Sequence, residues 1–466
     1  MKKFYFILLL SLITSIIKAE NIKENQVQES KSDSNKLAYF FKNGEFGGHA
    51  RFASFYTNNS KNLSDSYAMG VGMGIDFESA KFYGFQMGIS GFFIYNILSS
   101  DLSALDSLTN QPNRYEVGLF DIENPNNRHD LDRLEDLYLK YSFRKSVVKF
   151  GKQHLKTPFI NLQDGRMRPS LVDGITINFN ELKNIEIEAG YINGISPRST
   201  VKWYTIEHSM AVYGAGVNSL GKISNYKGNI ESKYIAYWGL GYKINKDLKL
   251  YFHQQYVDNV MNTGMFELDY LHELNNKNKI NISGMFVHQA KVNNGGSDSV
   301  LKTYFEGQQE SNIFSTRIGF IKQRNKFYLN YTRITNDGKY LMPREWGRDP
   351  FYTFMSRERN EGLADVHALT FNHKTDLIKS KLTSDWGLGY YDLPDVKEYA
   401  KNKYGLPSYI QLNIDLKYKF ENFLEGLTID FIYIQKFKNG NTYNNDKYVI
   451  NKVDLSLFNI IANYTF

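Results

Sequence analysis

Apolar and polar side chains alternate along the last part of the chain. From residue 458 onward every second position is apolar or small, and the positions between are mostly polar. The first set consists of Phe458, Ile460, Ala462, Tyr464 and Phe466. Successive side chains of a β-strand point to opposite faces, so this spacing predicts a strand with one apolar face. An aromatic face of this kind is typical of a transmembrane β-barrel, whose outer side meets lipid and whose inner side meets water.

The same two-residue period recurs along most of the chain from Gly44 onward. We therefore expect an all-β fold, a transmembrane antiparallel β-barrel of eighteen strands that occupies residues 44–466. The expected strands are residues 44–57, 66–79, 83–97, 134–144, 147–153, 172–180, 185–193, 231–242, 248–257, 262–273, 278–290, 311–321, 326–334, 364–374, 381–391, 408–420, 427–437 and 452–466.

The gaps between these strands alternate in length. After even-numbered strands they are short, and comprise residues 80–82, 145–146, 181–184, 243–247, 274–277, 322–325, 375–380 and 421–426. After most odd-numbered strands they are longer, and include residues 98–133, 154–171, 194–230, 291–310, 335–363 and 392–407. This alternation is expected for a barrel with short periplasmic turns at one end and long extracellular loops at the other. An even number of strands also places both termini in the periplasm.

Single strands separate two environments. In the segment 409–420 one face is apolar, and consists of Ile410, Leu412, Ile414, Leu416, Tyr418 and Phe420. The other face consists of Gln411, Asn413, Asp415, Lys417 and Lys419. The first face suits lipid and the second a water-filled lumen, because a Lys near the membrane midplane costs about 2–4 kcal/mol. The same alternation predicts that five basic side chains face the lumen: Lys140, Lys149, Arg317, Lys417 and Lys419. The alternative for each of them is that it only solvates the lumen wall.

The start of the chain has the pattern of a secretory signal peptide. Two lysines precede a short apolar run, and Ala19 offers a small residue for cleavage. The run is short for a membrane span of about 20 residues, so cleavage after Ala19 is favoured over an uncleaved anchor. Loss of residues 1–19 removes three lysines and lowers the formal charge from +7 to +4, too small a surplus to indicate nucleic acid. The polar residues 20–43 are expected to form a flexible periplasmic leader.

Composition agrees with a barrel. The chain contains 33 Phe and 34 Tyr, yet its mean hydropathy is −0.45. A barrel accounts for both values, because only alternate residues are apolar and aromatic side chains gather at the two membrane interfaces. Beyond the first residues, no stretch is long and apolar enough for a transmembrane helix. The chain has no Cys, which excludes disulfides and most structural zinc sites.

Several motifs resemble one family. Residues 150–170 contain a strand ending in Gly-Lys-Gln, then Leu-Lys-Thr-Pro, then Asp-Gly-Arg-Met-Arg-Pro. Residues 189–199 read Ala-Gly-Tyr-Ile-Asn-Gly-Ile-Ser-Pro-Arg-Ser, and residues 343–350 read Pro-Arg-Glu-Trp-Gly-Arg-Asp-Pro. These motifs, with the hairpin around residues 426–428, resemble the OprD-type outer-membrane porins, which are substrate-specific bacterial porins. The resemblance implies an eighteen-stranded porin, a monomer or a loose homotrimer, for passive diffusion of small hydrophilic solutes that often carry a carboxylate, such as amino acids, small organic acids and peptides.

In that family the third and seventh extracellular loops fold inward and form a constriction. The resemblance places these loops at residues 154–171 and 335–363 of this chain. Their charged side chains include Asp164, Arg166, Arg168, Arg344, Glu345, Arg348, Asp349, Arg357, Glu358, Arg359 and Glu361. A planar guanidinium can hold a carboxylate at two points, so arginines opposite acidic side chains would align a dipolar solute. The alternative is that these charges pair with each other and hold the loops in place, and the two roles are compatible.

Two other functions remain as alternatives. The first is a barrel-type lipid hydrolase, but none of the nine His lies in a nucleophile motif such as Gly-x-Ser-x-Gly, so we expect no enzyme activity. The second is an adhesin or structural barrel, for which loop 194–230 would be the contact surface. Adhesion would predict long loops without inward-folding charge clusters.

We expect no cofactor and no metal site. The run of Asn, Gly and Asp at residues 293–298 offers oxygen ligands, but its spacing does not match an EF-hand, and a solvated turn is favoured over a calcium site. The expected partners are outer-membrane lipid and lipopolysaccharide, the barrel assembly machinery and small solutes. Tyr464 and Phe466 are the expected assembly signal.

Overall fold

The structure is a computed structural model that describes residues 37–307 and 310–466. The expected signal peptide, residues 1–19, and most of the expected leader, residues 20–36, lie outside the described residues. In the described end of the leader, Leu37–Lys42 form the helix α2. The peptide N–H of Ala80 donates to the carbonyl of Phe40, and the ring of Phe40 packs against Phe82, so the short turn at residues 79–84 holds this helix.

Nineteen strands follow α2 in the described part of the chain. The first ten are β1 (Glu45–Asn58), β2 (Ser66–Glu78), β3 (Phe85–Ser99), β4 (Leu131–Phe143), β5 (Ser146–Gln153), β6 (Leu171–Phe179), β7 (Ile185–Ser196), β8 (Tyr204–Thr205), β9 (Ile235–Lys243) and β10 (Leu248–Val257). The others are β11 (Met261–Glu273), β12 (Lys279–Lys291), β13 (Glu310–Lys322), β14 (Asn325–Ile334), β15 (Val366–Ile378), β16 (Leu382–Asp392), β17 (Tyr409–Lys419), β18 (Leu427–Lys438) and β19 (Leu455–Thr465). Short helical turns are η3 (Val117–Leu119), α3 (Ile206–Ser209), η4 (Asn422–Leu424) and η5 (Asp446–Tyr448). None of the helices in the described ranges is long and apolar enough to cross a membrane.

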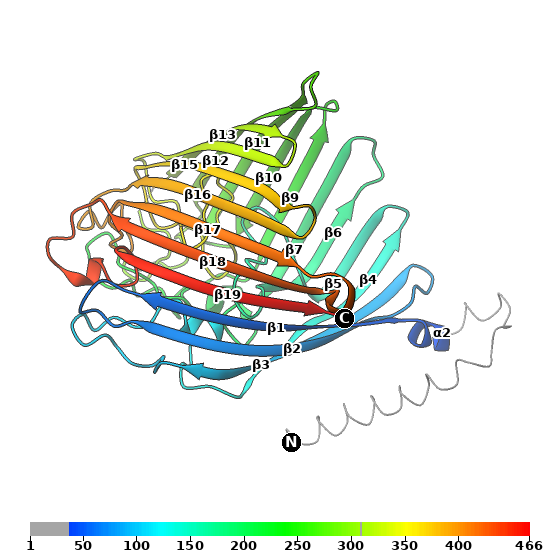
Figure 1. Cartoon of the computed structure of the whole chain (residues 1–466), viewed down its shortest axis with the longest axis horizontal. Coiled ribbons are helices and arrows are strands. Elements are labelled where there is room, and N and C mark those ends of the chain that lie inside the picture. Colours follow the sequence, from blue (N-terminus) through cyan, green and yellow to red (C-terminus); the bar gives the residue numbers. More distant parts are fainter. Residues whose placement is uncertain (1–36, 308–309) are drawn as a thin grey trace.

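The strands close into an antiparallel barrel. Neighbours in sequence pair with each other, and β1 pairs with both β2 and β19, which closes the ring. The two-residue strand β8 pairs only with the end of β7, whereas β7 pairs with β9 along its length, so eighteen of the strands form the wall. Figure 1 shows α2 and the C-terminus at the end of the barrel that carries the short turns. The expected eighteen-stranded barrel is therefore confirmed.

All eighteen expected strands are present, with shifted boundaries. The two largest shifts are of four residues: the expected strand 364–374 ends only at Ile378, and the expected strand 231–242 begins only at Ile235. The second shift has a local cause. The first residues of that expected strand belong to a loop, because the N–H of Glu231 donates to Gly296 and the N–H of Lys233 donates to Asp258. These backbone donors are therefore unavailable to the sheet.

The expected assignment of faces also holds. On β17, the lumen-facing Gln411 and Asn413 donate to the carbonyl of Ser356, which lies in the loop between β14 and β15. On the outer face of β10 to β13, Phe252, Phe266, Phe286 and Phe314 pair in register across four strands. The ring centres of Phe252 and Phe266 are 4.8 Å apart, and those of Phe286 and Phe314 are 4.9 Å apart. The wall therefore presents rings outward and hydrogen-bonding groups inward, as a water-filled barrel in lipid requires.

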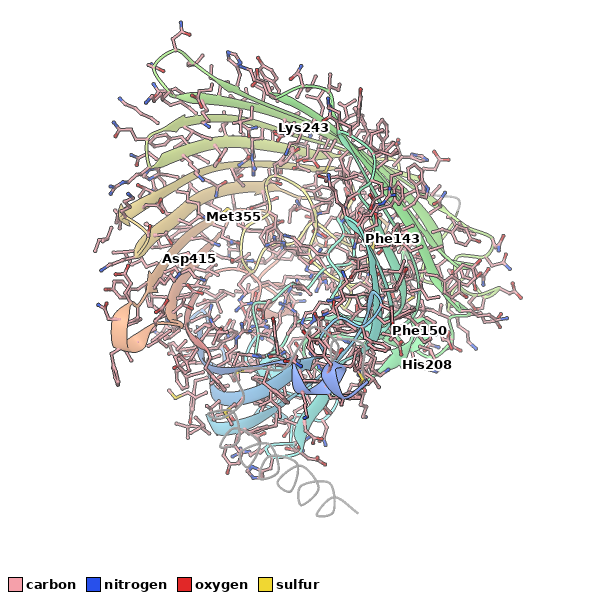
Figure 2. The ribbon with its side chains drawn as sticks, turned by 90° about the vertical axis from the view of Figure 1, so that its right-hand side faces the viewer. Phe143, Phe150, His208, Lys243, Met355 and Asp415 are labelled. Carbon is pink, nitrogen blue, oxygen red and sulfur yellow. The ribbon has the colours of Figure 1, made fainter. Side chains whose placement is uncertain are left out.

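Extracellular loops fill part of the interior. Loop two is residues 100–130, loop three 154–170, loop four 197–234 and loop seven 335–365. The largest fully buried side chains include Trp346 and Tyr340 of loop seven and Phe159 of loop three. Figure 2 shows Met355 of loop seven inside the ring of strands. The core of this protein is therefore formed by loops packed against the inner wall.

Candidate functional site

Loops three and seven meet inside the barrel. The side-chain amide of Asn161 donates to the carbonyl of Arg348 at 3.1 Å, and its oxygen accepts from the N–H of Arg348 at 3.0 Å. The N–H of Asn161 donates to the carbonyl of Trp346, and the hydroxyl of Ser170 donates to the carbonyl of Glu345. These contacts join the middle and the end of loop three to the backbone of loop seven, so the two loops form one packed unit.

A buried ion cluster anchors loop three to the wall. The Glu135 carboxylate of β4 accepts from Arg133 at 2.9 Å and from Nε of Arg168, in loop three, at 2.6 Å. Arg133 also donates to the carbonyls of Pro169 and Pro197, which ties loops three and four to the same strand. A carboxylate shared by two guanidiniums in the protein interior offsets charges that would otherwise be costly to bury.

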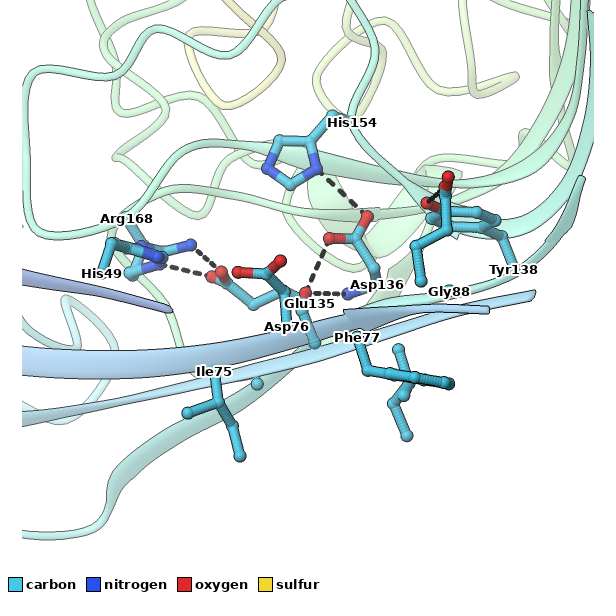
Figure 3. Close-up of a pocket in the computed structure, with 14 residues that line it drawn as sticks. His49, Ile75, Asp76, Phe77, Gly88, Glu135, Asp136, Tyr138, His154 and Arg168 are labelled. Atoms are coloured by element: carbon cyan, nitrogen blue, oxygen red, sulfur yellow. Dashed lines mark hydrogen bonds and ion pairs between the residues drawn. The ribbon is translucent and has the colours of Figure 1, made fainter. Parts of the chain in front are cut away.

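A β-bulge makes this anchor possible. Ile89 of β3 pairs with Leu137, but Gly91 pairs with Leu134, so two residues of β4 lie opposite one residue of β3. Glu135 and Asp136 are those two residues, and both side chains line the interior (Figure 3). An uninterrupted strand would point one of them toward lipid.

Beside this anchor lies a recess of about 310 Å³. Its lining includes His49, Asp76, Asp136, His154 and Arg168 (Figure 3). Nδ1 of His154 lies 3.1 Å from Asp136, and the guanidinium of Arg168 contacts His49. Among the described residues, no group of three or more His, Cys, Asp or Glu side chains is placed to hold a metal ion.

Three arginines from three loops lie close together in the described interior. Arg166 of loop three is 5% exposed, and its Cζ lies 5.1 Å from the centre of the Phe55 ring. Arg357 of loop seven lies over the same ring at 4.8 Å. Arg198 of loop four is close enough to act electrostatically on both. Burial and then the repulsion of Arg357 and Arg198 lower the pKa of Arg166, but a guanidinium stays charged in proteins.

Several nitrogens of this arginine cluster have no partner within the described residues. They are Nε and Nη1 of Arg166, Nε of Arg198 and Nε of Arg357. Buried donors without partners are costly, and like charges side by side add repulsion. An anion placed among these nitrogens would relieve both effects, so the arginine cluster has the chemistry of an anion site.

Most of the other charged residues that the sequence singled out in the two loops are already engaged. Asp164 pairs with Arg51 of β1, and Arg344 pairs with Glu361 at 2.9 Å. Arg359 donates to backbone carbonyls of loop seven, and the carboxylate of Glu345 accepts from the N–H of Tyr213. For these side chains, the structure supports the alternative in which charges hold the loops in place.

Two further charged residues of loop seven, Glu358 and Arg348, differ in how far they are exposed to solvent. Glu358 is buried, and burial raises its pKa to about 8; nearby, Lys436 of β18 donates to the carbonyl of Arg357. Arg348 is instead exposed, and its guanidinium lies 5.3 Å from the Phe354 ring. Arg348 is therefore the most solvated of the loop arginines that the sequence singled out.

The basic residues expected on the lumen wall are mostly paired or stacked. Lys140 pairs with Glu78, and Lys417 pairs with Asp430 at 3.1 Å. Arg317 lies 4.7 Å from the rings of both Tyr328 and Tyr352. Lys149 also lies over a ring, 4.4 Å from the centre of the Tyr138 ring. Lys419 is exposed, at the end of β17 nearest the short turns.

Sequence reasoning missed the contributions of loops two and four. Arg198 lies in loop four, and in loop two Val117, Leu119 and Phe120 pack with Met167 of loop three. A short run of buried apolar residues inside a long polar loop is a signal that could have indicated inward folding of loop two. The motif Ile-Ser-Pro-Arg-Ser, which contains Arg198, was recognised, but its place beside loop three depends on the fold.

Comparisons with known proteins give a family and a fold. The sequence profile of the outer membrane porin, OprD family, matches residues 39–361. No curated protein sequence matches the chain significantly.

Solved structures share the fold at low sequence identity. OccK9 (OpdG) of Pseudomonas aeruginosa has a TM-score of 0.71 at 13% identity, over 92% of this chain and 99% of that one. OccAB2 of Acinetobacter baumannii has a TM-score of 0.70 at 14% identity, with the same coverage. OpdK of Pseudomonas aeruginosa, solved with vanillate, has a TM-score of 0.65 at 13% identity, again over 92% and 99%.

Proposed function

The chain belongs to the OprD family of outer membrane porins and forms an outer-membrane channel for small solutes, and from this premise we propose that it selects solutes carrying a carboxylate. The observation that carries the proposal is the arginine cluster of Arg166, Arg198 and Arg357, with its unpartnered nitrogens. A carboxylate offers the planar pair of oxygens that a guanidinium fork binds at two points.

The surroundings strengthen this attraction. The low-dielectric walls of a narrow interior increase the field of the arginines beyond its value in water. Selective passage also requires weak enough binding for release, and a site shared by several loops can pass a solute from one arginine to the next. OpdK, which shares the fold, was solved with vanillate, an aromatic carboxylate. The proposed transport is passive diffusion without energy coupling, and the channel acts without catalysis.

The setting of the channel is also proposed in finer detail. Residues 1–19 act as a cleaved signal peptide, and the assembly machinery recognises the end of β19 with Phe466. Outer-membrane lipid and lipopolysaccharide surround the wall. The alternative of an adhesin is disfavoured because loops two, three, four and seven pack into the lumen.

The experiment that tests the proposal is Arg166→Ala in planar bilayers. We expect the reversal potential in a salt gradient to shift toward cation selectivity. Block of the current by benzoate should weaken about 10–150-fold, the equivalent of about 1.5–3 kcal/mol for hydrogen bonds to a charged group. The effect should be larger at low ionic strength, because salt screens the field.

Arg348→Ala is the matched control, since it removes an exposed guanidinium from the same packed unit and should change both values little. Arg168→Ala is a poorer test than the family resemblance suggests, because Arg168 pairs with Glu135 and its loss would disturb the loop. An unchanged reversal potential and unchanged block in Arg166→Ala would show that the arginine cluster lies away from the passage.

A further inference from the structure

One of the buried carboxylates of loop two, that of Glu116, lies beside the arginine cluster without binding it. Glu116 is 0% exposed. Two residues later comes Gly118, where an added methyl group would lie 3.1 Å from Nε of Arg166. Arg166 acts electrostatically on Glu116, and Glu116 acts on Arg357. Within the described parts of the chain, however, no ion pair joins Glu116 to a basic side chain.

Other partners occupy the carboxylate of Glu116. The hydroxyl of Thr57, on the inner face of β1, donates to Oε1, and the side-chain amide of Asn113 donates to Oε2 at 2.9 Å. The oxygen of the Asn113 amide accepts in turn from the N–H of Val117 at 2.7 Å, which fixes its orientation. Each carboxylate oxygen of Glu116 is thus held by a neutral donor, while charged donors of the neighbouring arginine cluster have no hydrogen-bond partner among the described residues.

We propose that Glu116 is a restrained counter-charge, which Thr57 and Asn113 hold off the arginine cluster, and that this restraint sets how tightly the cluster binds a carboxylate-bearing solute. The proposal rests on the proposed function and names a specificity-determining residue for it. Glu116 lowers the net charge that a solute carboxylate meets, which speeds release. Because it is held, Glu116 does not itself occupy the place of that carboxylate.

The two halves of this idea predict opposite effects of two nearly isosteric substitutions. Glu116→Gln removes the counter-charge, so benzoate should block the current at about tenfold lower concentration, as expected for one unit charge several ångströms away. Thr57→Val removes one restraint and leaves the charge, so Glu116 can turn toward Arg166 and compete. Benzoate block in Thr57→Val should therefore weaken several-fold. The double variant Thr57→Val/Glu116→Gln should behave like Glu116→Gln.

The measurement is the benzoate concentration for half-block in planar bilayers, together with the reversal potential in a salt gradient. Loosening of loop two alone would move Glu116→Gln and Thr57→Val in the same direction, and that outcome would overturn the proposal. So would an unchanged half-block concentration in Glu116→Gln while Arg166→Ala still weakens block. If Arg166→Ala itself has no effect, the proposed carboxylate site fails first, so the two failures are distinguishable.

Discussion

The anchor of loop three allows a quantitative prediction for Glu135→Gln. Glu135 is 1% exposed and is the shared counter-ion of two buried guanidiniums, those of Arg133 and Arg168. The amide of Gln retains the shape but not the charge, so both guanidiniums lose their counter-ion while they remain buried. Removing one partner of a buried ion pair costs about 3–5 kcal/mol. Arg133 lies in a wall strand, which cannot leave the barrel. The least costly way to remove an unpaired charge from the interior is therefore for Arg168 and the rest of loop three to detach into water.

Each 1.4 kcal/mol changes an equilibrium constant tenfold, so the constant for detachment of loop three should rise by about two to three and a half powers of ten. Hydrogen exchange measured by mass spectrometry on the detergent-solubilised barrel should show faster exchange over residues 154–170. In planar bilayers, the single-channel current should become noisier, because loop three moves in and out of the passage.

Asp173→Asn provides a matched control at the base of loop three, where β5 and β6 flank the loop. Asp173 pairs with Lys152 at 2.6 Å, but these side chains are 32% and 22% exposed, and such surface pairs contribute only about 0–1 kcal/mol. Exchange over loop three should change little in this control. The reasoning would be refuted if Glu135→Gln left exchange over loop three unchanged, or changed it no more than Asp173→Asn does.

Three further predictions concern the wall, the end of the chain and loop seven. Ile414→Lys places a charge on the outer face near the middle of β17 and should lower the free energy of unfolding, measured with urea in lipid, by about 2–4 kcal/mol. Asp415→Lys, on the inner face, should lower it much less. Equal losses would contradict the assigned faces. Phe466 is 58% exposed and is joined to Gly48 by two backbone hydrogen bonds of 3.0 Å. Its removal should lower the folded fraction in the outer membrane far more than its small buried area suggests. Normal insertion of the shortened chain would count against an assembly role. Burial raises the pKa of Glu358 to about 8, so the Glu358 carboxyl holds its proton more tightly when loop seven is packed than when the loop is open. The packing of loop seven is therefore most stable below the ordinary pKa of 4.5 and weakens as the pH rises toward 8. Exchange over residues 349–361, corrected for its intrinsic pH dependence, should therefore rise from pH ~5 to ~8 in the native chain but not in Glu358→Gln.

The sequence by itself determined the wall of this protein. A period of two residues fixes which side chains share a face, and the contrast between lipid and water fixes which face points outward. The segment 409–420 therefore showed its orientation before any contact was known, and Gln411 and Asn413 do face the lumen. Loop lengths added the number of strands and the two ends of the barrel. All of these signals are local, so they can be read along the chain.

Only the tertiary structure decided which charges remain available to a solute. Arg166, Arg168 and Arg344 had equal standing in the sequence. Arg168 and Arg344 pair with Glu135 and Glu361, whereas two nitrogens of Arg166 have no partner in the described part of the chain. These differences come from residues far apart in the sequence, such as Glu135, which a bulge turns inward.

Loops have no repeating period that predicts where their side chains point. Their placement depends on which buried donor finds an acceptor when several loops enter one lumen. Arg198 and Glu116 are the clearest cases. Arg198 lies in loop four and Glu116 in loop two, and the sequence predicted inward folding for neither loop. Each residue reaches the arginine cluster only because loops two, three, four and seven pack together inside the closed barrel.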